Sequence, residues 1–96
     1  MRKQLYIIAY DITEDKSRYT VADLIETEGG KRINLSVFEC MLSKADKKRL
    51  LGKIHPYIDP KTDIVVCYHV CTACYIKSVF IPELPSERHF KGIVVV

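Results

Sequence analysis

The stretch Leu5-Tyr6-Ile7-Ile8-Ala9-Tyr10-Asp11 decides the fold of this chain. Its first six residues are aliphatic or aromatic and carry no charge, a pattern typical of a central strand that is covered on at least one face. Asp11 ends the apolar run and therefore lies at the carboxyl end of the strand. The sequence thus predicts a buried strand that delivers a carboxylate to a loop.

Helical patterns follow this strand twice. Thr13-Glu14-Asp15 offers N-cap oxygens and acidic side chains for a helix dipole, and apolar residues then recur at helical spacing until Gly29-Gly30. Ser43-Lys44-Ala45-Asp46 resembles a capping box, and a second apolar stripe runs from it to His55-Pro56. The sequence therefore predicts one helix that ends at Gly29-Gly30 and a second helix that ends at His55-Pro56.

Strand patterns fill the remaining sequence. Alternation from Lys31 to Leu42 predicts one strand, with an apolar face formed by Ile33, Leu35 and Val37. Residues 63–68 are rich in β-branched side chains and follow a turn, so they predict a further strand. Residues 71–77 show no clear pattern, and residues 79–81 predict a short strand that ends at a proline.

Together these elements predict an α+β protein. Two helices interleaved with strands favour a ferredoxin-like βαββαβ sandwich, in which both helices cover one face of the sheet. The strands are apolar nearly throughout, so we expect a homodimer that packs sheet against sheet and covers the second face. Residues 92–96 form a β-branched run and are predicted to be an additional C-terminal strand that pairs with the partner subunit.

Length and composition set further limits. The 96 residues predict one domain over residues 1–96, and a composition of 48% hydrophobic and 28% charged residues is typical of globular proteins. Polar residues interrupt the longest apolar stretch, 64–81, so we expect no membrane span, which needs about 20 continuous apolar residues. The apolar run near the N-terminus is shorter than that of a secretion signal, so we expect a cytoplasmic protein. A net charge of +3 is compatible with a phosphate-rich partner.

Asp11 is the first candidate for chemistry. A carboxylate at the end of a strand can ligate Mg²⁺ and leave the other positions to water and phosphate. The alternative is that Asp11 caps the turn or the next helix through its side-chain oxygens. If two Asp11 carboxylates meet across a dimer axis, a cation or proton must lie between them. Glu14 and Asp15 could assist a metal ion, although acidic residues in the first turn of a helix are usually explained by the helix dipole.

Basic residues near this strand and helix form the second candidate. Arg18, Arg32, Lys16, Lys31 and Arg2 could contact phosphates without reading base sequence. A denser basic run lies on the second predicted helix, where we expect a solvated face. It consists of Lys44, Lys47, Lys48, Arg49 and Lys53.

The segment Cys71-Thr72-Ala73-Cys74 has the spacing of half a zinc site or of a redox pair. A structural zinc site would need further ligands, such as His69, Cys67 or a partner subunit. We expect reduced, small and buried thiols at these positions instead.

Read together, these motifs resemble the second CRISPR-associated (Cas-two) protein family. The resemblance is specific over residues 5–42 and looser from Asp63 to Ile81. The residues that carry it are Tyr6-Ile7-Ile8-Ala9-Tyr10-Asp11-Ile12, Asp15-Lys16, Arg18, Val21-Ala22, Leu24, Arg32-Ile33 and Ser36-Val37-Phe38-Glu39-Cys40.

The resemblance implies a ferredoxin-like homodimer with facing sheets, whose members are described as divalent-metal-dependent endonucleases acting on RNA or DNA. It implies Asp11 as the catalytic residue and ligand of Mg²⁺ or Mn²⁺, and Arg18 and Arg32 as contacts to the backbone. Ser36 and Phe38 belong to the family motif. Thr20 is a departure, because some relatives carry a basic residue there.

The same resemblance implies an alternative function of another class. The dimer would then be a non-catalytic bridge that binds DNA between two dimers of the CRISPR integrase during acquisition of new spacers. A toxin-like ribonuclease is a third possibility. A nuclease would need a cation and Asp11, whereas a bridge would need neither.

Overall fold

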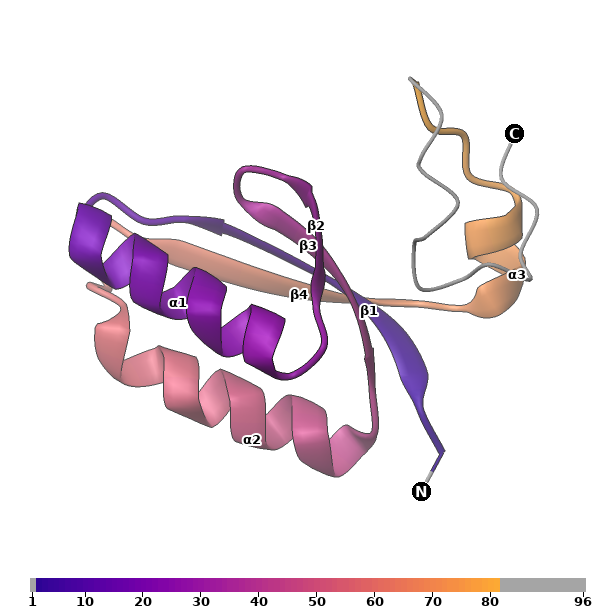
Figure 1. Cartoon of the computed structure of the whole chain (residues 1–96), viewed down its shortest axis with the longest axis horizontal. Coiled ribbons are helices and arrows are strands. Elements are labelled where there is room, and N and C mark those ends of the chain that lie inside the picture. The colour runs from indigo at the N-terminus through magenta and orange to yellow at the C-terminus, as the bar shows by residue number, and fades with distance from the viewer. Residues whose placement is uncertain (1, 82–96) are drawn as a thin grey trace.

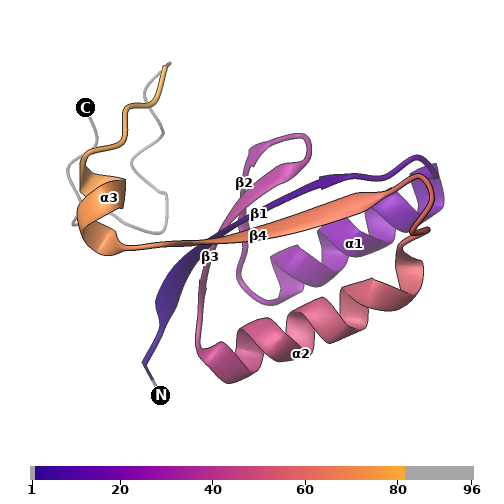
Figure 2. The same ribbon diagram turned by 180° about the vertical axis from the view of Figure 1, so that it is seen from behind.

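The computed structural model describes residues 2–81, and residues 1 and 82–96 lie outside the described part (Figure 1). In chain order its elements are β1 (Gln4–Asp11), α1 (Asp15–Thr27), β2 (Lys31–Asn34), β3 (Val37–Leu42), α2 (Lys44–Ile54), the 3₁₀ turn η1 (His55–Tyr57), β4 (Ile64–Val70) and α3 (Thr72–Ile76). The strands form one antiparallel sheet in the order β2-β3-β1-β4. Helices α1 and α2 lie side by side on one face of it (Figures 1 and 2). This arrangement confirms the predicted ferredoxin-like fold.

The core lies between this face of the sheet and the two helices. Successive side chains of a strand point to opposite faces, and the even-numbered residues of β1 face the helices. Ile8 is fully buried and lies opposite Phe38 of β3 and Cys67 of β4. Further core side chains come from both helices and from β3, namely Val21, Ala22, Ile25, Leu50, Ile54, Cys40 and Leu42.

The predicted helix boundaries hold, but the two starts differ in mechanism. The Ser43 hydroxyl accepts a hydrogen bond of 3.1 Å from the Asp46 amide, as expected of an N-cap. Glu14 is the N-cap of α1 but makes no such bond, because its carboxylate accepts the Ser17 hydroxyl instead. Gly29 follows α1 with a φ of +94°, a conformation that glycine adopts without steric cost.

The single strand predicted from Lys31 to Leu42 is wrong. The chain reverses after Asn34, whose side-chain oxygen accepts a hydrogen bond of 2.6 Å from the Leu35 amide. The reversal makes β2 and β3 an antiparallel pair with a register shift, and it leaves Leu35 80% exposed. The buried apolar residues of β3 are therefore the even-numbered Phe38, Cys40 and Leu42, and not the predicted odd-numbered set.

The region after Asp63 also differs from the prediction. Strand β4 continues to Val70, and the segment without a clear pattern contains the short helix α3. Residues 79–81 are not a strand within the described part of the chain, because the chain leaves the sheet at Cys71 and they have no strand beside them there. The tail predicted at 92–96 lies outside the described residues. No helix within residues 2–81 has the length and apolar character needed to cross a membrane.

The second face of the sheet carries the odd-numbered residues of β1 and their neighbours. Helix α3 lies on this side, opposite α1 and α2 (Figure 2). Its Tyr75 is buried and donates a hydrogen bond of 2.8 Å to the carboxylate of Glu39, which is also fully buried. Beyond this contact the face is apolar and half-buried or exposed, through Ile7, Ala9, Val37, Met41, Ile64, Val66, Tyr68 and Val70.

Candidate nucleic-acid interface

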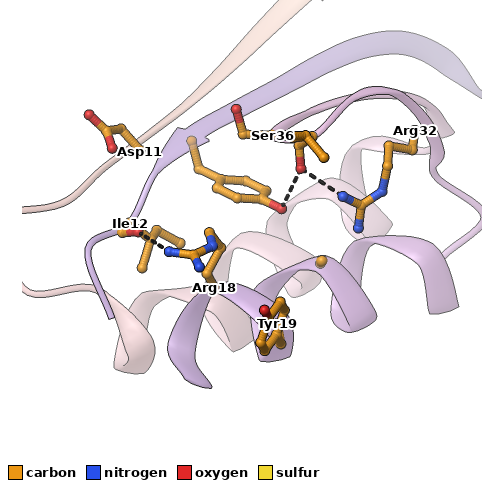
Figure 3. Close-up of a pocket in the computed structure, with 9 residues that line it drawn as sticks. Asp11, Ile12, Arg18, Tyr19, Arg32 and Ser36 are labelled. Atoms are coloured by element: carbon orange, nitrogen blue, oxygen red, sulfur yellow. Dashed lines mark hydrogen bonds between the residues drawn. The ribbon is translucent and has the colours of Figure 1, made fainter. Parts of the chain in front are cut away.

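Strand β1 places Asp11 where the sequence predicted it. Asp11 is the last residue of the strand and pairs with Ile64 at the start of β4. Its position in the alternation puts its carboxylate on the open face of the sheet, and Figure 3 shows it directed away from Arg18 and Arg32. Within residues 2–81 no hydrogen bond or ion pair engages this exposed carboxylate. The alternative role as a cap is therefore not seen here, and the Asp11 oxygens remain available to a ligand.

A cleft of about 480 Å³ lies beside Asp11 and is referred to as the Asp11 cleft. It is formed by the end of β1, the first turns of α1 and the β2–β3 turn (Figure 3). Its lining residues are Tyr10, Asp11, Ile12, Arg18, Tyr19, Ala22, Arg32, Leu35 and Ser36. The fold thus brings Asp11 and both predicted arginines to the lining of one cleft, while the Asp11 carboxylate itself points toward the open face of the sheet.

Arg18 holds the loop that follows Asp11. Its Nη1 donates a hydrogen bond of 3.1 Å to the carbonyl oxygen of Ile12, and its Nη2 is paired with the Asp15 carboxylate. The Asp15 pairing raises the pKa of the guanidinium, which is charged in any case. The guanidinium also lies 5.5 Å from the ring centre of Tyr19. These contacts fix a positive charge at the mouth of the Asp11 cleft.

Arg32 is fixed in a similar way on the other side. Its Nη1 donates a hydrogen bond of 2.7 Å to the carbonyl oxygen of Leu35, and its guanidinium lies 4.9 Å from the ring centre of Phe38. Phe38 is fully buried, and the Ser36 carbonyl accepts a hydrogen bond of 3.1 Å from the Tyr10 amide. The two motif residues therefore shape the turn that presents Arg32.

Tyr10 also belongs to this site, and no role was predicted for it from the sequence. Its ring stacks on Phe38 at 6.1 Å, and its hydroxyl donates a 3.4 Å hydrogen bond to the Leu35 carbonyl, which also accepts from Arg32. Burial raises the pKa of Tyr10, while the charges of Arg32 and Arg18 act in the opposite direction. The available signal was a tyrosine that directly precedes Asp11 and lies on the same face of the strand as Tyr6 and Ile8.

The two predicted lysines are not part of the cleft. Lys16 and Lys31 are exposed, and neither lines the Asp11 cleft. Lys31 lies opposite Glu39 in the β2–β3 pair, and so belongs to the open face of the sheet. Thr20, the departure from the family pattern, donates its hydroxyl proton to the Lys16 carbonyl at 2.9 Å. A helix-internal bond therefore replaces the basic side chain at this position.

Two residues of the basic run on α2, Arg49 and Lys53, are paired with acidic neighbours. Arg49 forms ion pairs of 3.0 Å with both Glu28 and Asp46, and Lys53 lies 3.8 Å from Glu28. The Glu28 and Asp46 carboxylates raise the pKa of Arg49. These pairs connect α2 to the end of α1 and offset part of its positive charge. The main basic feature at the candidate site is therefore the arginine pair and not α2.

Asp63 is a residue that the sequence did not single out. Its carboxylate accepts hydrogen bonds from the Thr13 amide at 3.0 Å and from the Asp59 amide at 2.9 Å. These bonds lower the pKa of Asp63, the Thr13 amide most strongly. They tie the loop after Asp11 to the loop before β4, fifty residues away. No local sequence signal reveals a contact of this range.

The donor set of one subunit is sparse for a metal ion. Within the described residues no three His, Cys, Asp or Glu side chains come together as a metal site. The Glu14 and Asp15 carboxylates are engaged by Ser17 and Arg18 and do not add to Asp11. Mg²⁺ is commonly held by one or two carboxylates, with water and substrate phosphate filling the other positions. An exposed, unengaged Asp11 fits that pattern, most closely if a second subunit supplies a second carboxylate.

The expectation of buried thiols at Cys71 and Cys74 is wrong. Both residues are exposed, whereas Cys40 is buried and Cys67 is half-buried. The reason is that Cys71 lies where the chain leaves the sheet, and α3 turns only Tyr75 into the protein.

Comparison with known proteins decides the family. The model of the family "CRISPR associated protein Cas2" matches residues 4–78, which include every element described above. The chain belongs to the Cas2 family. The predicted resemblance is thereby confirmed.

Two relatives illustrate the range of similarity. A "CRISPR-associated endoribonuclease Cas2 4" of Rhodospirillum rubrum is 38% identical over 69 residues, which cover 72% of this chain and 55% of the relative. The chain thus matches little more than half of that protein's length. A "CRISPR-associated endonuclease Cas2 2" of Thermus thermophilus is 35% identical over 88 residues, which cover 92% of this chain and 94% of the relative.

A solved structure supports the fold over most of the chain. A chain in a "Partial Cas6-RT-Cas1--Cas2 complex" superposes with a TM-score of 0.67 and 27% identity, and the match covers 88% of this chain and 92% of that one. A Cas2-like chain of this fold therefore occurs in an assembly that includes Cas1.

Proposed function

We propose that this protein acts in CRISPR spacer acquisition as a divalent-metal-dependent nuclease that hydrolyses phosphodiester bonds of RNA or DNA. The observation that carries the proposal is the Asp11 cleft, where the fold of a Cas2 family member places two fixed arginines next to the strand end that carries the unengaged Asp11 carboxylate. The names of the two relatives, an endoribonuclease and an endonuclease, support the same reaction class.

The arginines supply the electrostatic part of this function. Arg18 and Arg32 are each anchored to a backbone carbonyl, so their charges are positioned before a ligand arrives. A guanidinium group has more N–H donors than the two contacts of Arg18 use, so this side chain can also bind a phosphate oxygen. Such contacts do not depend on base identity, so cleavage should show little sequence preference and binding should weaken with salt.

A homodimer completes the proposed site. The open face of the sheet is largely apolar outside the Tyr75–Glu39 contact, and large exposed apolar faces favour association. Asp11 lies on that same face, so stacking two copies about a two-fold axis can bring two Asp11 carboxylates toward one another. Two like charges at close range favour a cation between them. Sedimentation velocity of the purified chain tests this step, and a monomer at micromolar concentration would contradict it.

The residues of the proposed site then have separate roles. A bound Mg²⁺ or Mn²⁺ supplies Lewis-acid chemistry to the phosphodiester. Asp11 holds the ion, Arg18 and Arg32 orient the phosphate backbone, and the Asp63 carboxylate keeps the loop after Asp11 in place through the Thr13 amide.

The test compares Asp11→Asn with Asp23→Asn. Asp23 is an exposed aspartate on α1 outside the Asp11 cleft, so this variant makes the same change in charge and shape elsewhere. Labelled single-stranded RNA and duplex DNA are incubated with each protein in Mg²⁺ or EDTA. We expect cleavage by the parent and by Asp23→Asn in Mg²⁺ only, and a loss of about 100-fold or more in Asp11→Asn, in line with the loss of a metal ligand. Equal cleavage by both variants would remove Asp11 from the reaction.

A second function is favoured by one observation, the likeness to a chain in a complex that contains Cas1. In this role the dimer binds Cas1 integrase and duplex DNA without cutting either strand. Arg18→Glu and Arg32→Glu should then weaken DNA binding in the assembly, while Asp11→Asn should leave it intact. Reconstitution with Cas1 and a spacer-length duplex, read by gel filtration and integration, separates this role from the nuclease.

A further inference from the structure

Cys71 and Cys74 are a pair of thiols that the proposed function does not use. Both side chains are exposed, and their Sγ atoms lie 3.1 Å apart, within hydrogen-bonding distance. This separation is about 1 Å longer than an S–S bond, so the two sulfurs are free thiols that need little movement to become bonded.

The two thiols are not equivalent. The Cys74 amide donates a hydrogen bond of 3.3 Å to Cys71 Sγ. The pKa of Cys71 is lowered, first by the hydrogen bond with the Cys74 thiol and then by this amide, while the same thiol contact raises the pKa of Cys74. Because the thiolate is the nucleophile in exchange with disulfides, Cys71 is the sulfur that attacks first.

The surroundings of Cys71 are basic and favour an anionic ligand. A cleft of about 280 Å³ lies beside it, referred to as the Cys71 cleft. Its lining includes the basic side chains Arg2 and Lys3 together with His69, and it includes no acidic residue among those described. A small molecule that carries carboxylates is therefore favoured over a neutral or cationic one at this position.

The other two cysteines contrast with this pair. Burial raises the pKa of Cys40 to about 12, and burial also raises the pKa of Cys67. Both point toward the helix-covered side of the sheet and pack in or against the core. Oxidation is therefore directed to Cys71 and Cys74.

We propose that Cys71 and Cys74 form a thiol–disulfide exchange site that reacts with small anionic disulfides and closes reversibly to an intramolecular disulfide. The Cys71 thiolate attacks one sulfur of the small disulfide, forms a mixed disulfide and releases one thiolate. Cys74 then gives its proton to solvent and attacks Cys71 Sγ, which releases the second thiolate. The chain loses two electrons and two protons, and the small disulfide becomes two thiols.

Closure of this disulfide acts on α3, whose Tyr75 contacts the open face of the sheet. Tyr75 directly follows Cys74 and holds α3 to Glu39 through its buried hydroxyl. A bond between Cys71 and Cys74 ties the start of α3 to the end of β4 and so restricts how α3 can move relative to the sheet.

The test uses the purified 96-residue chain and glutathione disulfide as the probe. After incubation, free thiols are alkylated under denaturing conditions and the modified cysteines are located by mass spectrometry. We expect an intramolecular Cys71–Cys74 disulfide that added dithiothreitol reverses. In Cys74→Ser, glutathione should accumulate on Cys71, whereas Cys71→Ser should react far more slowly at Cys74. The matched control Cys67→Ser should form the disulfide at the parental rate.

Three results would contradict the proposal. The first is equal glutathione addition to Cys71 and Cys74 in the two serine variants, and the second is no disulfide in the parent while the thiols react with iodoacetamide. The third concerns the Cys71 cleft: Arg2→Glu with Lys3→Glu should slow glutathione disulfide about 10-fold while leaving the neutral hydroxyethyl disulfide unaffected. Equal effects on both disulfides would refute the preference for anions. These readouts do not involve nuclease activity or DNA binding, so they are independent of the proposed function.

Discussion

The tight fit at Gly30 gives a prediction whose size can be worked from the structure. Gly30 is buried between the end of α1 and the start of β2, and its amide donates a hydrogen bond of 2.9 Å to the Ile25 carbonyl. A Cβ at this position would lie 2.5 Å from Ile25 Cγ2, 2.8 Å from the Ile25 carbonyl oxygen and 3.1 Å from Cys40 Sγ. The carbonyl is backbone, so it cannot move aside without distorting the end of α1.

The matched control is Gly52, which lies inside α2 with open space around the same hypothetical Cβ. Replacing either glycine by alanine removes about 0.4–1 kcal/mol of unfolded-state entropy. For Gly52→Ala this gain is kept, so the free energy of unfolding should rise by about 0.5–1 kcal/mol. For Gly30→Ala, overpacking costs about 1–3 kcal/mol and outweighs the gain. The two substitutions should therefore change stability in opposite directions.

Urea unfolding followed by circular dichroism measures both variants under one condition. The midpoint should fall for Gly30→Ala and rise for Gly52→Ala, with unchanged m-values that report the same surface exposed on unfolding. Because β2 begins directly after Gly30 and carries Arg32, Gly30→Ala should also weaken binding to nucleic acid. A midpoint for Gly30→Ala at or above that of the parent would refute the steric argument.

Three further predictions follow from buried contacts and one titrating group. Phe38→Ala removes a fully buried ring and should lower the free energy of unfolding by about 3–5 kcal/mol, measured by urea denaturation; a loss below about 1 kcal/mol would contradict its place in the core. Tyr75→Phe removes one buried hydrogen bond to Glu39 and should cost about 1–3 kcal/mol, and the effect should disappear in a Glu39→Leu background, which has no acceptor, if that bond is the cause. The pKa of Asp63 is lowered, first by the Thr13 amide, so its contribution to stability is present above the ordinary aspartate pKa and is lost as pH falls through the lowered value. Thermal unfolding between about pH 2 and 6 should therefore depend less on pH in Asp63→Asn than in the parent, and identical pH profiles would exclude this linkage.

Much of the fold could be predicted because the determining signals are local. The uncharged run before Asp11 indicates a buried strand, and Ser43 with Asp46 marks a helix start through a contact only three residues apart. The β2–β3 reversal was missed because the apolar alternation continues through it. A hydrogen bond from the Leu35 amide to the Asn34 side chain accompanies the turn there, and the hydrophobic pattern does not reveal that bond.

The candidate site could be predicted only in part. Asp11, Arg18 and Arg32 were identified by type and by the family resemblance, and they do line one cleft. The roles of Tyr10 and Asp63 could not be predicted, because both depend on contacts with residues far away in the chain. Tyr10 reaches the β2–β3 turn 25 residues on, and Asp63 holds a loop 50 residues back.

The sequence by itself determined the strand that ends in Asp11, the two helices, the charge balance and the family, because these follow from residue type and short-range spacing. Only the tertiary structure decided which way each side chain faces. It put the Asp11 carboxylate on the open sheet face and the arginines at the helix-covered side, and it exposed Cys71 and Cys74 as a close pair. The physical reason is that the face on which a side chain lies depends on strand register and chain reversal. These are set by contacts between residues that are distant in the sequence.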